Sequence, residues 1–166
     1  METYDWSRFI KRIAIKASVQ QIYDSWATAA GLEKWFLRKT LIFKEDKKPR
    51  AAKIPIQKGD SYQWYWHGYG DEAVEYGTIL DANGKDSIRF NFGKSGTVSI
   101  IIREEKNEIM LELIQDTIPV DEMSRVNIHL ACSTGWVFYL ANLKSILEGG
   151  IDLRNKNSDI LNVINS

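Results

Sequence analysis

The sequence has few of the residues that build disulfide, metal or nucleophilic sites. Cys132 is the only cysteine among 166 residues, so no intrachain disulfide can form, as is usual in a reducing compartment. There are two histidines, and the chain has no Gly-x-Ser-x-Gly, phosphate-loop or dinucleotide-binding motif. We therefore predict no catalytic residue, no metal ligand and no cofactor.

Long apolar runs and an excess of one charge are also lacking. No segment approaches the length of about 20 apolar residues that spans a bilayer. The 22 basic and 22 acidic residues cancel, which argues against nucleic acid or an anionic membrane as a partner. Residues 1–6 are acidic and aromatic, unlike a signal peptide. We expect a cytoplasmic protein with one domain over 1–166, comprising a core at 8–155 and a C-terminal tail at 156–166.

The chain opens with a predicted strand and two short helices. Residues 9–16 alternate between apolar and polar side chains, as a strand does. Ser18 is followed three residues later by Gln21, which matches the capping box at a helix start. Thr28 can cap a second short helix over 29–36.

The middle of the chain predicts a run of strands. Asn83-Gly84 is a strong hairpin signal between two of them. The predicted strands cover 61–69, 73–80, 87–92, 97–103, 108–115 and 126–130. Because no helix separates consecutive strands, we expect them to pair antiparallel.

One long helix is predicted near the end, over 134–147. Its apolar face contains Trp136, Leu140, Leu143 and Leu147, at helical spacing. Ser133 or Thr134 can cap its first turn, and Gly149-Gly150 can end it. Residues 136–141 are apolar on every side, as in a helix that is covered on several sides or borders a cavity. The fold class is therefore α+β: a curved antiparallel sheet of six or seven strands wrapped around a long C-terminal helix.

This order of elements resembles the helix-grip fold of START-like (SRPBCC) proteins. Within that superfamily, the chain is similar to the domain of the activator of the ninety-kilodalton heat-shock protein ATPase and its homologues. The residues that carry the resemblance are Ile13–Ser18, Ile22–Trp26, Leu32–Phe36, Glu75–Leu80, Gly135-Trp136 and Asn142–Arg154. The superfamily includes lipid and hormone carriers, aromatic cyclases and chaperone partners, so the resemblance implies a fold more narrowly than a function.

Residues 44–53 form a basic stretch around Pro49. They include five basic and two acidic side chains, which is typical of a mobile surface loop. The alternative is a basic patch for an anionic partner, although no aromatic residues are interleaved.

His129 and Cys132 are three residues apart and raise the question of a metal or nucleophilic site. A zinc site needs three or four ligands, and a Cys-His nucleophile needs the two side chains in contact. In a regular strand, an offset of three places them on opposite faces, so we interpret the pair as structural.

Aromatic residues from consecutive strands are expected to face the long helix. The predicted ligand-binding residues are Trp64, Trp66, Tyr76, Phe90, Phe92, Trp136, Tyr139 and Leu140. Counting along the strands places His67, Glu75 and Arg89 on the alternate, solvent-facing side, unless the register slips by one residue. The alternative for each aromatic residue is a place in a packed core.

The leading hypothesis is a non-enzymatic domain that binds a small hydrophobic or aromatic ligand between sheet and helix. The second is a protein-interaction module, with a chaperone or another protein as partner, for which the family resemblance and the basic loop at 44–53 argue. The third is an enzyme such as a polyketide cyclase, which ranks last because the pattern forces no pair of ionisable residues inward.

Overall fold

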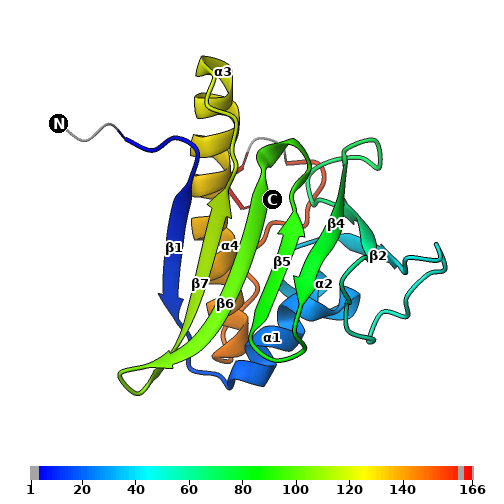
Figure 1. Ribbon diagram of the computed structural model, residues 1–166, viewed down its shortest axis with the longest axis vertical. Coiled ribbons are helices and arrows are strands. Elements are labelled where there is room, and N and C mark those ends of the chain that lie inside the picture. Colours follow the sequence, from blue (N-terminus) through cyan, green and yellow to red (C-terminus); the bar gives the residue numbers. More distant parts are fainter. Residues whose placement is uncertain (1–3, 161–162, 166) are drawn as a thin grey trace.

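A computed structural model describes residues 4–160 and 163–165. In these residues, one antiparallel sheet contains seven strands in the order β1-β7-β6-β5-β4-β3-β2 (Figure 1). The strands are β1 (Phe9–Ala14), β2 (Lys39–Phe43), β3 (Ser61–Tyr65), β4 (Val74–Ala82), β5 (Ser87–Asn91), β6 (Thr97–Glu105) and β7 (Glu108–Asp116). The sequence did not predict β2, which follows directly on the second short helix.

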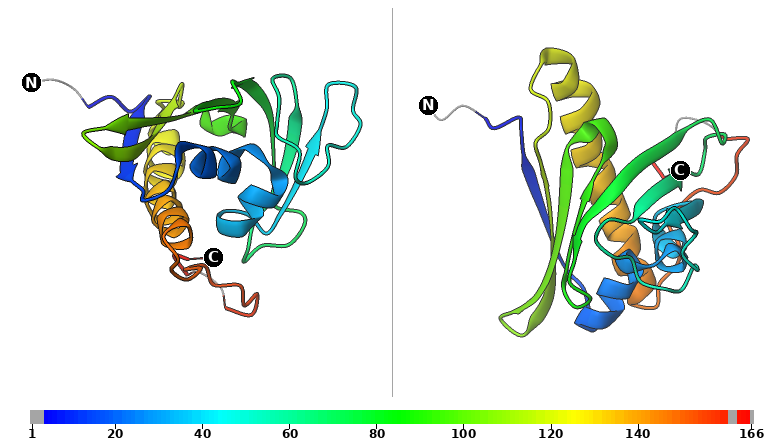
Figure 2. Two further views of the ribbon diagram at one scale, coloured as in Figure 1. Left: turned by 90° about the horizontal axis from the view of Figure 1, so that it is seen from below. Right: turned by 45° about the vertical axis from the view of Figure 1, so that its right-hand side comes forward.

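Two short helices carry the chain from one edge of the sheet to the other. α1 (Val19–Ala27) begins at Ser18, where the predicted capping box with Gln21 is formed. α2 (Ala29–Trp35) begins at Thr28, whose hydroxyl accepts a hydrogen bond from Gly31 N. Because β1 and β2 lie at opposite edges, these two helices close one end of the sheet's concave face (Figure 2).

The long helix starts earlier than the sequence predicted. α3 (Glu122–Ser124), a π-helical segment (Arg125–Leu130) and α4 (Ala131–Leu147) follow one another without a break. The expected strand at 126–130 is therefore wrong, because its alternating apolar residues fall within this helix. The expected cap at Ser133 or Thr134 is also wrong, since Asp121 caps the first turn through Ser124 N.

All the helices lie on one face of the sheet, and α4 crosses that face at an angle (Figure 2). The core is the contact layer between that face and the helices, and it includes Ile88, Phe90, Leu111, Leu113 and Leu143. Tyr76 does not belong to this layer: it lies on the outer face of β4 and is 59% exposed. The prediction that Tyr76 faces the helix is wrong by one residue of register, and Glu75 points inward instead.

Gly77 explains which face of β4 points inward. It pairs with Tyr62 of β3, and a Cβ at Gly77 would overlap the Tyr62 hydroxyl and the carbonyl oxygen of Asn91. That hydroxyl donates a 2.6 Å hydrogen bond to Asn91 O. The Tyr62 ring therefore occupies the space that a side chain on β4 would need, and Gly77 lies on the inner face together with Glu75 and Ile79.

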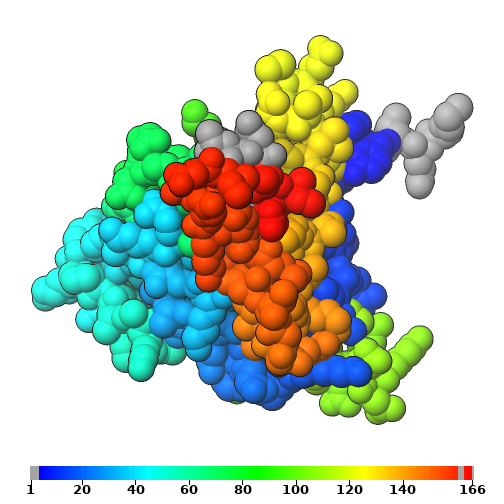
Figure 3. Space-filling model, turned by 180° about the vertical axis from the view of Figure 1, so that it is seen from behind, coloured from blue at the N-terminus to red at the C-terminus, as the bar shows by residue number. Residues whose placement is uncertain are grey.

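The chain after α4 returns along the back of the molecule. Gly149 has a positive φ of 82° and ends the helix, as predicted. Figure 3 shows the following segment (orange-red to red) lying between the long helix and the blue-to-cyan part of the chain. Asn142 of α4 holds this segment: its amide nitrogen donates to Trp35 O and Asp152, and its amide oxygen accepts from Leu153 N.

Arg154 fixes the same segment to the end of α2. Its buried guanidinium donates to the carbonyl oxygens of Glu33, Lys34 and Leu37 and to the Asp152 carboxylate. The Asn142–Arg154 part of the sequence motif is therefore a structural clamp between α2, α4 and the C-terminal segment.

Candidate functional site

Aromatic rings fill the space between the concave face of the sheet and α4. The Trp136 ring lies at the centre, with ring centroids 5.1 Å from Phe36, 5.7 Å from Phe92 and 5.8 Å from Trp26. These partners come from α1, the end of α2 and the end of β5, so one helical side chain joins three parts of the fold. Packed rings occupy the interior rather than a large cavity.

A buried hydrogen-bond chain fixes the orientation of Trp136. Its indole Nε1–H donates to Gln115 Oε1 at 2.8 Å, and Gln115 Nε2 donates to Ser95 O at 2.7 Å. Gln115 is fully buried, and its two bonds leave little freedom to its amide. The indole plane is thus set by β7 and by the turn before β6.

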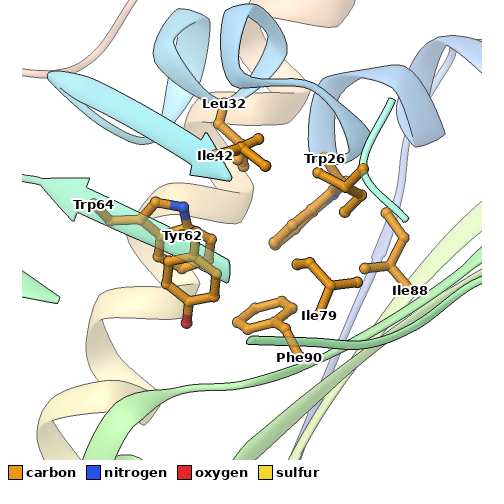
Figure 4. Close-up of a pocket in the computed structure, with 9 residues that line it drawn as sticks. Trp26, Leu32, Ile42, Tyr62, Trp64, Ile79, Ile88 and Phe90 are labelled. Carbon is orange, nitrogen blue, oxygen red and sulfur yellow. The ribbon is translucent and has the colours of Figure 1, made fainter. Parts of the chain in front are cut away.

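A small void lies in the interior (Figure 4). Its volume is about 10 Å³, close to the minimum for one water molecule. It is lined by Trp26, Leu32, Ile42, Ile56, Tyr62, Trp64, Ile79, Ile88 and Phe90. Trp64 and Phe90, two of the predicted ligand-binding residues, border this void and have no room for an organic ligand beside them.

A larger apolar groove opens at the mouth between sheet and helix. It has a volume of about 230 Å³ and is lined by Phe36, Trp66, Phe92, Ala131, Cys132, Gly135, Trp136 and Tyr139. The Phe36 ring packs edge-on against Trp66 and Tyr139, with centroid distances of 5.1 and 4.8 Å. We call this the mouth groove.

A second hollow continues from the mouth groove. Trp66, Gly135 and Tyr139 border both, so the two form one continuous surface. The second hollow has a volume of about 590 Å³ and adds Tyr69, Glu72, Ala73, Val74, Glu75, Val163 and Ile164. We call it the acidic hollow, because Glu72 and Glu75 are its charged side chains in the described part of the chain.

Gly135 forms the helical wall shared by both hollows. It lies inside α4, where glycine costs roughly 1 kcal/mol relative to alanine. A Cβ built there meets no atom within 4 Å, so no neighbour in the described structure requires a glycine at this position. The absence of a side chain leaves open space between the Trp66 side of the groove and the helix.

Burial shifts the ionisable groups of the site toward their neutral forms. It raises the pKa of Glu75, raises that of the Cys132 thiol and raises that of Tyr139 to about 12. Glu75 also disfavours the thiolate of Cys132 by charge repulsion. The site therefore presents apolar walls and, at Glu75, a carboxyl group that is a weaker acid than an ordinary glutamate.

The structure divides the eight predicted ligand-binding residues into four groups. Trp66, Phe92, Trp136 and Tyr139 line the mouth groove. Trp64 and Phe90 line the interior void, Leu140 is buried in the core, and Tyr76 is on the outer face. The sequence analysis did not include Phe36, Cys132, Gly135 or Glu75 among the ligand-binding residues. Gly135 was a usable signal for the groove, because a glycine interrupts an otherwise apolar helix face there.

His129 and Cys132 have separate surroundings. The His129 ring is buried between Tyr4 and Trp6, with Nε2 2.8 Å from the Tyr4 hydroxyl and Nδ1 2.8 Å from Trp6 O. Cys132 borders the mouth groove instead. The two lie in one helix and not in a strand, so the expected geometry was wrong, although the side chains are still separated.

The curved sheet, the gripped helix and the groove between them define a helix-grip protein of the START-like class. No helix within residues 4–160 and 163–165 is long and apolar enough to cross a membrane. A protein-family model described as "Activator of Hsp90 ATPase homolog 1-like protein" matches residues 16–148, and the chain belongs to that family. A search of curated protein sequences found no match.

Several solved structures share the fold. Protein SSP2350 from Staphylococcus saprophyticus is 15% identical, with 89% of this chain and 96% of that chain covered and a TM-score of 0.68. The Aha1 dimer from Colwellia psychrerythraea is 18% identical, with 86% and 97% covered and a TM-score of 0.66. DynU16, a protein of the dynemicin biosynthetic locus, is 14% identical, with 86% and 48% covered and a TM-score of 0.63. At these identities the similarity concerns the fold alone.

Proposed function

We propose that this protein binds a small apolar or aromatic molecule in the mouth groove. The observation that carries the proposal is the groove itself: an aromatic-lined opening of about 230 Å³ with a helical glycine in its wall. Ligand pockets are typically apolar clefts with a few polar groups and volumes of roughly 300–1,000 Å³. A ligand of one or two rings suits the groove, and a larger one would extend into the acidic hollow.

The rigidity of the walls supports this proposal. Trp136 is fixed by its bond to Gln115, and Phe36 is packed against three other rings of the site: those of Trp66, Trp136 and Tyr139. Preformed walls reduce the ordering cost of binding, because few side chains lose freedom when a ligand enters. The proposed ligand site is therefore at the mouth, and the interior beneath the helix serves as its packed support.

Filling the groove from Gly135 tests the proposal. The wild-type protein is screened by thermal shift against lipids, flavonoids and polyketides, and at 100 times its Kd a bound compound should raise Tm by about 5–10 °C. Gly135→Leu should abolish that shift, because its side chain projects into the groove. Gly135→Ala should add about 0.5–1 kcal/mol of stability, since its Cβ meets nothing within 4 Å.

Ala141→Leu is the matched control, because Ala141 is exposed in the same helix and lines neither hollow. This variant should bind as the wild type does. A compound that shifts the wild type and Gly135→Leu equally would place its site elsewhere, and a screen without any hit would refute the proposal.

A second candidate function is protein interaction, and an exposed apolar stripe on the long helix favours it. Met123, Val126, Leu130 and Val137 are between 46% and 68% exposed and follow at spacings of three, four and seven residues. The solved Colwellia relative is described as a dimer, so a second copy of this chain is the partner we propose for the stripe. The chaperone ATPase in the family's description is the alternative partner. Analytical ultracentrifugation of the protein alone shows whether it forms the dimer.

The basic loop at 44–53 lies apart from this stripe. It follows β2 at one edge of the sheet, whereas α4 contacts β1 at the opposite edge. The loop stays a separate candidate contact surface, to be tested by comparing the partners captured with and without it.

A further inference from the structure

Glu75 gives the proposed ligand site a charge preference. We propose that the combined groove selects a ligand with a positively charged nitrogen, held against the Glu75 carboxylate while its apolar body covers the aromatic rings. This inference rests on the proposed ligand-binding function and names the chemical class of its ligand. An amine or quaternary ammonium group attached to an aromatic or aliphatic body fits the description.

The position of Glu75 is set by the sheet. It pairs with Trp64 across β3 and β4, so both side chains leave the same, inner face. A Cβ at Gly93 would overlap Glu75 Oε1, which means that the carboxyl group lies directly against the backbone of the turn after β5. From there it borders the acidic hollow.

The carboxyl group of Glu75 has no partner of its own in the described part of the chain. No hydrogen bond or salt bridge to it is formed there, although the inward polar groups of Gln115 and Asn142 are all paired. Burial raises its pKa, as expected for a carboxylate that lacks a compensating cation. A carboxylate in this state gains most from a ligand that supplies the missing charge.

The remaining walls favour a cation over an anion. Among the described residues that line the mouth groove and the acidic hollow, none is Lys, Arg or His. Trp66, Tyr69, Phe92, Trp136 and Tyr139 contribute aromatic rings, whose faces attract organic cations by their quadrupole. Charge and ring chemistry therefore point to the same ligand class.

Three probes with one naphthalene ring and different charges test the inference: (1-naphthylmethyl)trimethylammonium, 1-naphthalenemethanol and 1-naphthaleneacetate. Their affinities for the full chain are measured by isothermal titration calorimetry at neutral pH. We expect the cation to bind about tenfold more tightly than the neutral probe and the anion to bind more weakly than both. In Glu75→Gln, the cation should lose most of this advantage, whereas the affinity of the neutral probe should change by less than about twofold.

Glu104→Gln is the matched control, because Glu104 is an exposed carboxylate of β6 that lines neither the mouth groove nor the acidic hollow. It should leave the preference for the cation nearly unchanged. If the neutral probe binds and the cation has no advantage, or if Glu75→Gln weakens all probes alike, the charge preference is refuted and the proposed ligand site stands. If none of the probes binds, the inferred charge preference is refuted, and the thermal-shift screen decides separately whether the proposed ligand site stands. Preferential binding of the neutral probe would indicate a protonated Glu75 that donates a hydrogen bond, and would also overturn this inference.

Discussion

Glu75 is a half-buried carboxyl group whose surroundings disfavour its charged form. It lies on the inner face of β4, among groove residues, without a cation beside it. Burial raises its pKa above the ordinary value of 4.5, so its ionised form is less favourable in the folded chain than in the unfolded chain. A carboxyl group that lowers stability at neutral pH is typical of a functional position.

Replacing Glu75 by Gln should stabilise the protein in a pH-dependent way. Below about pH 4.5 the carboxyl is protonated in both states, and the variant should have nearly the wild-type Tm. As pH rises through the raised pKa of the folded state, the wild type loses stability and the variant does not. The Tm difference between Glu75→Gln and wild type, followed by circular dichroism, should therefore grow from pH 4 to pH 8.

The groups that face Glu75 do not obscure this measurement. Burial raises the pKa values of Tyr62 and Cys132, which keeps both neutral across that pH range. Glu72→Gln serves as the control for loss of a rim carboxylate. A Tm difference that is constant with pH would show that Glu75 is not destabilised by burial.

The inward position of Glu75 could not be obtained from alternation alone. Val74, Tyr76 and Leu80 are the apolar residues at even positions of β4, and counting them suggests that this set faces the core. The Tyr62 ring decides otherwise, because it needs Gly77 beneath it. This is a contact between strands, which a single-strand pattern does not contain. By contrast, Phe90 and Phe92 were placed correctly, because all the inward residues of β5 are apolar.

The long helix illustrates a second limit of local patterns. Val126, Ile128 and Leu130 alternate with polar residues and were interpreted as a strand. They lie in the π-helical segment instead, with His129 held by the N-terminal residues Tyr4 and Trp6. A π-helical turn shifts the phase of the helix, so the usual 3.6-residue period does not fit the sequence there.

The helix also carries the exposed apolar stripe, and its proposed role in self-association can be tested. The wild-type protein should sediment as a dimer at high concentration. Val126→Glu should weaken that dimer at least about tenfold, because an unpaired charge would be placed in an apolar contact. Lys85→Glu, in the exposed β4–β5 turn, is the control and should leave sedimentation unchanged. A monomeric wild type at every concentration would rule out the dimer.

For the whole molecule, the sequence predicted the α+β class, the antiparallel sheet and the gripped helix correctly. The hairpins from β4 to β7 follow from local turn and alternation signals. The edge strand β2 was missed because Lys39–Phe43 is short and follows directly on α2. Whether the interior is hollow or filled depends on the total volume of rings from distant segments, such as Trp26, Phe36 and Trp136. No pattern along the chain predicts how completely these rings fill the space.

The contact between the C-terminal segment and α2 should account for a large part of the stability. Burial opposes ionisation of Asp152, but hydrogen bonds from Arg154 and Lys156 outweigh it and lower the pKa of Asp152 below its ordinary value of 3.8. A carboxylate with a lowered pKa stabilises the fold fully above that value, and the stabilisation is lost as pH falls toward the folded-state pKa. The Asp152 carboxylate should therefore contribute more to stability as pH rises, whereas the Glu75 carboxylate should lower stability as pH rises.

Two substitutions test the clamp by thermal denaturation. Arg154→Met keeps the apolar stem but leaves three carbonyl groups without their donor and removes one of the partners of Asp152, and should cost about 3 kcal/mol, or about 6–12 °C in Tm. Asp152→Asn should be most destabilising near pH 6, and its difference from the wild type should shrink as pH falls below 3.8 toward the lowered pKa of the folded state, because the wild type loses the stabilisation by its carboxylate in that range. Lys156→Met removes a largely exposed partner and should change stability by less than about 1 kcal/mol. Equal destabilisation by Asp152→Asn at pH 3 and pH 7 would show that Asp152 acts through packing or hydrogen bonding rather than charge.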